Sequence, residues 1–245
     1  MSTDTPLHIG IIGCSAEGAS LCYRTICAEA AAAMGPHAHP EITMHTPSLA
    51  LYVAALEAGD LDAVGALMAG SSRVLAGAGA DFLICPDNTI HQALPQAGPL
   101  ARPLLSIADA VADSAQARGL TRLGLLGTRW LVESDVYPAV MAARGIAVVR
   151  PDAADRATVD TAIFAELVPG RFDGTARAQC RAVIGRLKAA GCDGIVLGCT
   201  ELPLVLGPVE EGLPTLDSTR LLARAALAVA LRERSFPAAP AVATV

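Results

Sequence analysis

The chain has 245 residues, of which 53% are apolar and 17% charged, and its formal net charge is −6. This length and apolar content suffice for two small lobes or one large domain, and the acidic balance without a Lys/Arg cluster argues against a nucleic-acid partner. The first residues lack the basic segment of a signal peptide, and no apolar stretch has the pattern of a membrane span.

Eight short apolar segments are predicted as strands, and Ala-rich stretches with helical periodicity separate them. They span residues 7–13, 41–46, 81–86, 103–107, 122–128, 146–151, 193–198 and 213–217. Continuous apolar strands that alternate with helices are typical of parallel sheets covered on both faces, so we predict an α/β fold. The Pro/Ala-rich end at 232–245 is expected to be loose.

The chain contains an internal repeat. The Gly10–Gly13 spacing of the first predicted strand recurs as Gly124–Gly127, a shift of 114, and residues 81–91 match 193–203 with a shift of 112. Two copies of a βαβαβ-type unit follow from this. We predict a first α/β lobe made of residues 1–100 plus 211–245 and a second α/β lobe made of residues 101–210, each a mainly parallel sheet flanked by helices.

The repeat superimposes an acid on a thiol, because the shift of 112 places Asp87 on Cys199. Both residues follow a predicted strand, and ligands of parallel α/β sheets bind outside the carboxyl ends of the strands. We therefore expect Asp87 and Cys199 to face one ligand from opposite sides of a cleft. A helix N-cap is the alternative role for Asp87, and burial in the core is the alternative for Cys199.

Short polar residues surround these two positions. Asn88 and Thr89 follow Asp87, while Ser15 and Thr128 each follow the first strand of a lobe. Their hydroxyl and amide groups can hold a carboxylate. No G-x-G-x-x-G or Walker loop is present, and the His37/His39 pair has no accompanying ligand pattern, so we expect neither a nucleotide nor a metal.

The seven cysteines form no Cys-x-x-Cys pair, and their number is odd. Without an export signal, this usage indicates reduced thiols and a cytoplasmic location. For most of them a small hydrophobic side chain in the core is the expected role, and this interpretation covers Cys22, Cys27, Cys180 and Cys192.

Five segments resemble the aspartate/glutamate racemase superfamily, whose amino-acid racemases work without pyridoxal phosphate. They are "IGIIGCSAEGASLCYR" at 9–24, "NTIH" at 88–91, "LGTRW" at 126–130, "AELVPGRFDGTAR" at 165–177 and, most specifically, "VLGCTELPLV" at 196–205. The resemblance implies two pseudo-symmetric lobes with the active site between them. It also implies a homodimer, no cofactor, and an amino acid or related carboxylic acid as the small-molecule partner.

In the family two cysteines flank the substrate Cα, one removing its proton and the other returning a proton on the opposite face. Cys199 matches the second cysteine. Asp87 stands at the position of the first, with Cys85 two residues upstream, and we predict Asp87 for this role because the internal repeat selects it independently. A free carboxylate is a weaker base than a thiolate, so Asp87 would need burial or a neighbouring thiolate to raise its pKa.

Further positions follow from the resemblance. Asn88, Thr89, Thr128 and Thr200 match positions that hold the substrate carboxylate or adjoin the cysteines, and Thr46 aligns with a substrate-side loop. No residue matches securely the Arg and Lys that hold a side-chain carboxylate in some relatives, since Val168 stands where a Lys is found. Two alternatives stay open: a decarboxylase or isomerase that uses Cys199 as its single proton donor, and a non-catalytic protein that binds a small ligand.

Overall fold

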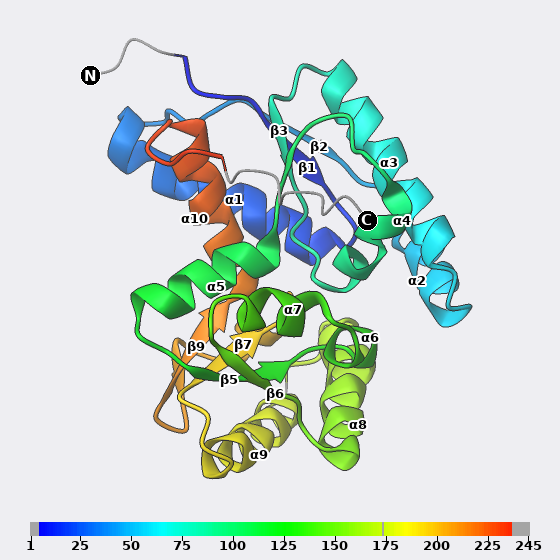
Figure 1. The fold of residues 1–245 in the computed structure, drawn as a ribbon, viewed down its shortest axis with the longest axis vertical. Helices are drawn as coiled ribbons and strands as arrows, with labels where there is room; N and C mark the ends of the chain where they lie inside the picture. The colour runs from blue at the N-terminus through cyan, green and yellow to red at the C-terminus, as the bar shows by residue number, and fades with distance from the viewer. Residues whose placement is uncertain (1–4, 173, 237–245) are drawn as a thin grey trace.

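A computed structural model describes residues 5–172 and 174–236 of the chain. Two mainly parallel sheets lie one above the other in Figure 1, each with helices against it. The α/β architecture with two parallel sheets is thus confirmed. Within the described residues no helix is both long and apolar enough to cross a membrane. Of the tail that we expect to be loose, residues 237–245 lie outside the described residues.

The first sheet has four parallel strands in the order β2-β1-β3-β4. The central strands β1 and β3 are fully buried, as expected for strands covered on both faces. The bounds of the four strands are β1 Ile9–Ile12, β2 Ile42–His45, β3 Phe82–Ile84 and β4 Leu104–Leu105.

The second sheet repeats this order as β6-β5-β7-β9 and adds β8 antiparallel at its edge. Strands β5 and β7 therefore correspond to β1 and β3, and the predicted repeat is present in the fold. The bounds of the five strands are β5 Arg122–Leu126, β6 Ala147–Val149, β7 Gly194–Leu197, β8 Val209–Glu210 and β9 Leu213–Asp217.

The repeated acids Asp81 and Asp193 hold equivalent places in the two sheets. The carboxylate of Asp81 accepts a hydrogen bond from the backbone N–H of His8 at 2.8 Å, next to the start of β1. The carboxylate of Asp193 accepts from the backbone N–H groups of Thr121 and Arg122 at 2.7 and 3.0 Å, at the start of β5. Each carboxylate thus connects the starts of the two central strands of its sheet, β1 and β3 or β5 and β7. This shared structural role explains why the repeat has an aspartate at both 81 and 193.

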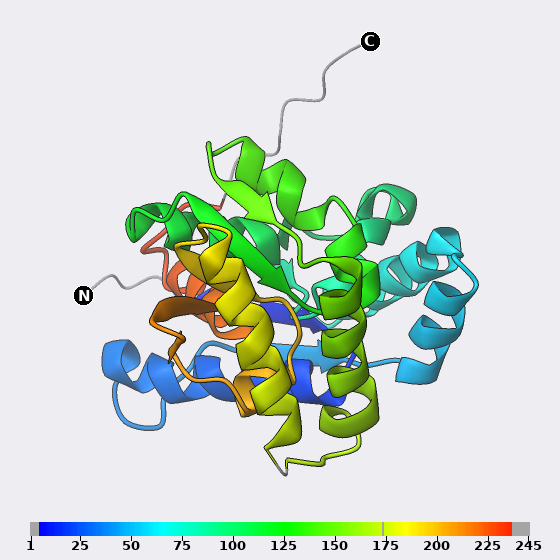
Figure 2. The same cartoon turned by 90° about the horizontal axis from the view of Figure 1, so that it is seen from below.

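Helices surround the two sheets, and several begin at a Ser or Asp whose side chain accepts from the backbone N–H three residues on. Figure 2, viewed from below, shows α8 and α9 over the outer face of the second sheet. The bounds are α1 Ala16–Met34, α2 Leu49–Glu57, α3 Leu61–Gly77, α4 Leu94–Ala97, α5 Ile107–Ala117, α6 Arg129–Glu133, α7 Val136–Ala142, α8 Ala153–Thr161, α9 Thr175–Ala189 and α10 Ser218–Ala230, with shorter 3₁₀ turns η1 Thr89–Ala93 and η3 Leu202–Leu204 and a π-helical segment η2 Ala162–Leu167.

The lobe boundaries differ from the predicted ones by one strand on each side. Strand β4 pairs with β3 in the first sheet, beyond the predicted boundary at 100, and β9 pairs with β7 in the second sheet, beyond the boundary at 210. Both occupy the fourth position of the strand order that the two sheets share. Helix α10 then returns to the first lobe, where Leu222 and Ala226 share a core with Ile9 and Ile11.

The absence of a side chain at Gly65 of α3 allows the backbone of α4, in the segment that follows Asp87, to pack directly against this helix. A Cβ at this position would lie 2.6 Å from the backbone N of Ala97 in α4, whereas a Cβ at Gly70 of the same helix would meet, among the described residues, only the far end of Arg73 at 3.9 Å. We expect Gly65→Ala to lower the free energy of unfolding by ~1–3 kcal/mol. The matched Gly70→Ala should raise it by ~0.5–1 kcal/mol, because alanine favours the helix.

Chemical denaturation of the two variants checks this pair of expectations. If both variants gained stability equally, α4 would not be seated on Gly65 as the structure has it.

Candidate active site

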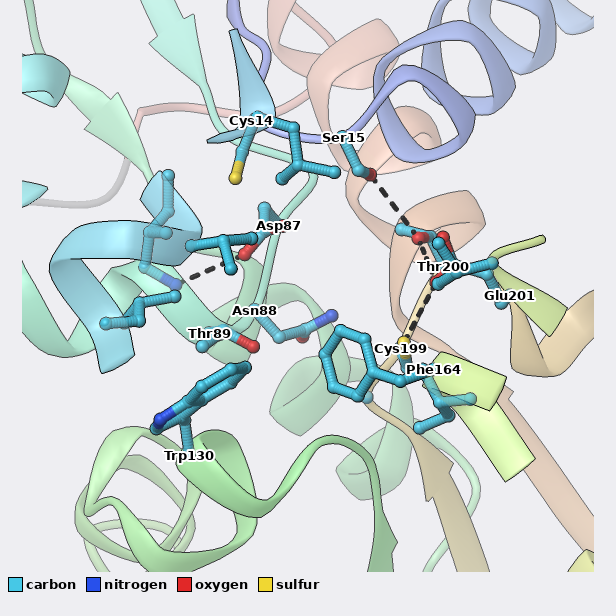
Figure 3. Close-up of a pocket in the computed structure, with 17 residues that line it drawn as sticks. Cys14, Ser15, Asp87, Asn88, Thr89, Trp130, Phe164, Cys199, Thr200 and Glu201 are labelled. Atoms are coloured by element: carbon cyan, nitrogen blue, oxygen red, sulfur yellow. Dashed lines mark hydrogen bonds between the residues drawn. The ribbon is translucent and has the colours of Figure 1, made fainter. Parts of the chain in front are cut away.

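The carboxyl ends of the two sheets face one pocket between the lobes (Figure 3), whose volume is about 600 Å³ including its open mouth. First-lobe residues come from the loops after β1 and β3 and from α2, and second-lobe residues come from α6, the η2 segment and the loop after β7. The lining residues are Cys14, Ser15, Leu49, Val53, Leu56, Asp87, Asn88, Thr89, Ile90, Trp130, Ile163, Phe164, Val168, Gly198, Cys199, Thr200 and Glu201.

Cys199 enters the pocket from the second lobe, directly after β7 and Gly198. Its thiol donates a hydrogen bond to Oε2 of Glu201 at 2.9 Å, and the Thr200 hydroxyl donates to the same oxygen at 2.7 Å. Burial first, and then the charge and hydrogen bond of Glu201, raise the pKa of the Cys199 thiol well above its usual range. The resting group is therefore a thiol with a carboxylate beside it that can accept its proton.

Asp87 enters from the first lobe, after β3. Its Oδ1 accepts from the backbone N–H of Ile90 at 3.2 Å, so the predicted capping role is present and occupies one carboxyl oxygen. The buried His91, whose pKa is lowered to about 4 by burial, donates from Nδ1 to the backbone carbonyl of Asp87 at 2.7 Å. Burial raises the pKa of the Asp87 carboxyl group itself. The loop is thus held on two sides while the carboxyl group faces the pocket.

Cys85 and Cys14 contact Asp87 in different ways. The Cys85 thiol is fully buried, lies 3.8 Å from the backbone carbonyl of Asp87 and does not line the pocket. The Cys14 thiol does line it, and burial first and then the charge of the nearby Asp87 carboxyl group raise the pKa of this thiol. Figure 3 shows the Cys14 sulfur directed toward Asp87. Of the two thiols beside Asp87, Cys14 is the one that a ligand can reach.

The Asn88 side chain is committed to the protein. Its Nδ2 donates to the Ser218 hydroxyl at 3.0 Å, its Oδ1 accepts from the Tyr137 hydroxyl at 2.6 Å, and Ser218 donates in turn to the backbone carbonyl of Leu197 in β7 at 2.8 Å. A first-lobe amide is thereby tied to α7, α10 and the strand that carries Cys199. Asn88 lines the pocket as predicted, but its polar atoms hold the lobes together.

Two predicted substrate-binding residues do not line the pocket. The Thr128 hydroxyl lies 3.0 Å from that of Thr89 and caps α6 by accepting from the N–H of Leu131, so it supports Thr89 from behind. Thr46 follows the edge strand β2, and its side chain lies against Gly13. The resemblance places both at the substrate, but the position of β2 at the sheet edge keeps Thr46 one strand away from it.

Ser15 and Thr200 lie where the two lobes meet. Their hydroxyl oxygens are 3.5 Å apart, and Ser15 also caps α1 by accepting from the N–H of Gly18 at 3.1 Å. The 19-residue helix α1 therefore directs its amino end toward the pocket, and this end of a helix favours a negative charge. The Ser15 and Thr89 hydroxyls and this helix end can hold a carboxylate, whereas the Thr200 hydroxyl donates to Glu201.

The rest of the pocket is apolar. Leu49 and Val53 of α2 face it from the first lobe, and Trp130 of α6 and Phe164 of η2 face it from the second, the two rings meeting edge to face at 5.6 Å. No Lys, Arg or His is among the described residues that line it. The charges available to a ligand are thus the carboxyl groups of Asp87 and Glu201.

Sequence reasoning named Cys199, Asp87, Asn88, Thr89, Thr200 and Ser15, and the structure brings these six to one pocket. It did not assign Cys14, Glu201 or the apolar wall to the site. Glu201 lies inside the "GCTE" motif, and Cys14 adjoins Ser15 at the end of the first strand, so both stood next to residues already selected.

The chain is thus a two-lobed α/β protein with a ligand-sized pocket at the carboxyl ends of its parallel strands. Within that class the chain belongs to the Asp/Glu/hydantoin racemase family, whose sequence model matches residues 9–226.

Solved relatives have the same fold over nearly the whole chain. A candidate Asp/Glu racemase from Yersinia pestis is 32% identical with a TM-score of 0.84, covering 92% of this chain and 99% of the other. An aspartate racemase homologue from Pyrococcus horikoshii OT3 is 25% identical with a TM-score of 0.76, covering 91% of this chain and 99% of the other.

A relative is also found by sequence. An uncharacterised protein from the pnlA 3′ region of Pectobacterium carotovorum subsp. carotovorum is 36% identical over 103 residues, which are 42% of this chain and 67% of that protein.

Proposed function

We propose that the protein is a cofactor-independent racemase or epimerase that inverts Cα of an amino acid or a closely related carboxylic acid. The observation that carries the proposal is that Cys199 and Asp87 line one pocket from opposite lobes, with Glu201 and Cys14 as further acid–base groups of the same lining. Two acid–base groups on opposite faces of one carbon are what inversion requires. Membership of the racemase family supports the same reaction.

The mechanism follows from the charges at the site. A group on one side removes the α-proton, the resulting carbanion is delocalised into the substrate carboxylate, and a group on the other side supplies a proton. Glu201 accepts the Cys199 proton when the thiolate acts as the base. The hydroxyls of Ser15 and Thr89 and the amino end of α1 stabilise the carboxylate as charge develops on it. The substrate ammonium group compensates the carboxyl groups of Asp87 and Glu201.

The lining indicates a substrate with an apolar side chain. A side-chain carboxylate would be desolvated against Leu49, Val53 and Phe164 with no cation to pair with, which is costly. We therefore expect leucine and methionine to exchange their α-proton faster than aspartate or glutamate.

A cation introduced at the pocket edge should change this preference. Val168 lines the pocket and is 46% exposed, so a lysine there can reach both solvent and ligand. We expect Val168→Lys to raise kcat/KM for glutamate relative to leucine by about tenfold or more. Phe172→Lys, which adds the same charge on an exposed residue outside the lining, is the control and should leave the ratio unchanged.

The proposal itself is tested by proton NMR in D₂O, without added cofactor, on each enantiomer of a panel of amino acids. Loss of the Cα–H signal together with appearance of the other enantiomer supports a racemase. Release of carbon dioxide from a dicarboxylic substrate would instead assign a decarboxylase that uses Cys199 alone. Binding without exchange would leave a ligand-binding protein.

A further inference from the structure

Each lobe presents one thiol–carboxylate pair to the pocket. In the second lobe the pair is Cys199 and Glu201, within one loop. In the first lobe it is Cys14 and Asp87, from the loops after the adjacent parallel strands β1 and β3, with the Cys14 sulfur directed toward Asp87 (Figure 3). The two loops of the first lobe lie side by side because strand ends of a parallel pair share one edge.

The internal repeat shows how the first-lobe pair arises. The shift of 114 that relates β1 to β5 places Cys14 on Thr128, and the shift of 112 that relates β3 to β7 places Asp87 on Cys199. The second lobe carries its thiol after its third strand and a hydroxyl after its first. The first lobe carries its thiol after its first strand and an acid after its third. Relative to the second lobe, the thiol of the first lobe therefore follows the neighbouring strand of the sheet.

The Cys14 side chain is free for this role, unlike its counterpart. Thr128 caps α6 with its own hydroxyl, whereas α1 is capped by Ser15, one residue after Cys14. The seven cysteines all lie within the described residues, and Cys14 and Cys199 are the two that line the pocket.

We propose that Cys14 is the proton-carrying residue of the first lobe and that Asp87 is its proton acceptor, in the way that Glu201 serves Cys199. The assignment rests on the proposed function. Asp87 takes the proton of the Cys14 thiol; the Cys14 thiolate then removes the α-proton, and the Cys199 thiol delivers its proton to the opposite face. The reverse reaction exchanges the two thiols, so that one proton leaves and one proton joins the carbon in either direction. A thiolate is the stronger base for a reluctant α-proton, which a carboxylate alone serves poorly.

The test measures deuterium uptake at Cα of L-leucine and D-leucine separately in D₂O, with Cys14→Ala, Cys14→Ser and the control Cys85→Ala, each checked for folding by its circular dichroism spectrum and thermal transition. We expect both Cys14 variants to slow inversion by at least about a hundredfold. We expect them to retain Cys199-dependent uptake into one enantiomer, and we expect Cys85→Ala to keep full activity.

Serine separates proton transfer from hydrogen bonding, because its hydroxyl can still donate to Asp87 but cannot act as a thiolate. Full inversion by Cys14→Ser would reduce Cys14 to a hydrogen-bond donor and overturn the assignment, as would full inversion by Cys14→Ala. Inversion lost in Cys85→Ala alone would move the role to Cys85. If the unmodified protein exchanges no α-proton, the proposed function fails, and the assignment fails with it.

Discussion

The Cys199→Ala variant is expected to lose interconversion of the two enantiomers by a factor of about 10³ or more, since a positioned acid–base group contributes ~10²–10⁴. The reason is geometric: Cys199 is the thiol of the second lobe at the pocket, and no other described lining residue of that lobe has a thiol. Polarimetry follows inversion, and NMR in D₂O follows exchange of each enantiomer. One enantiomer, whose α-proton faces the first lobe, should still exchange slowly.

Cys192 provides a matched control for this variant. It is a buried cysteine of the same lobe that does not line the pocket, so Cys192→Ala removes a core thiol without touching the site. We expect it to stay active. Full inversion by Cys199→Ala would contradict the two-sided mechanism, whatever the first lobe contributes.

The two-lobed fold and the pairing of Asp87 with Cys199 could be predicted because the internal repeat indicates both. Matching strands and matching loops at nearly constant shifts place Asp87 and Cys199 at equivalent strand ends, and parallel sheets bring such ends to one edge. The lobe boundaries could not be read in the same way. The short strands β4 and β9 have dissimilar sequences, so nothing in the chain showed that each completes its own sheet.

Other features depend on distances between segments far apart in the chain. The use of Asn88 is set by Tyr137 and Ser218, which approach it from α7 and α10, and a sequence shows only that an amide follows Asp87. The second-lobe part of the apolar wall comes from α6 and η2, and the sequence does not show which pocket these two segments face. Substrate preference was therefore the least predictable property.

The carboxyl groups of Glu201 and Asp87 occupy different places in the chain relative to their neighbouring thiols, but we assign them the same role. Glu201 stands two residues from Cys199 and accepts a hydrogen bond from its thiol, whereas Asp87 and Cys14 come from the loops after the neighbouring strands β3 and β1, and both line the pocket. The charge of Asp87 also raises the pKa of the Cys199 thiol, and the charge of Glu201 raises that of Asp87. The charges of the two lobes therefore act on each other across the pocket.

Asp87→Asn should slow inversion by about 10²–10⁴, and the exchange that survives should be that of the enantiomer opposite to the one retained by Cys199→Ala. Asparagine is close to isosteric and caps a helical turn as well as aspartate, so the bond from the Ile90 N–H is kept and only the acid–base function is removed. Unfolding by denaturant verifies that stability is retained. NMR of each enantiomer in D₂O then measures which enantiomer still exchanges its α-proton with each variant. The two variants should retain opposite enantiomers, because each leaves the acid–base group on a different side of the carbon intact. If both variants retained exchange of the same enantiomer, Asp87 and Cys199 would act on the same face, and Asp87 would serve only to shape its loop.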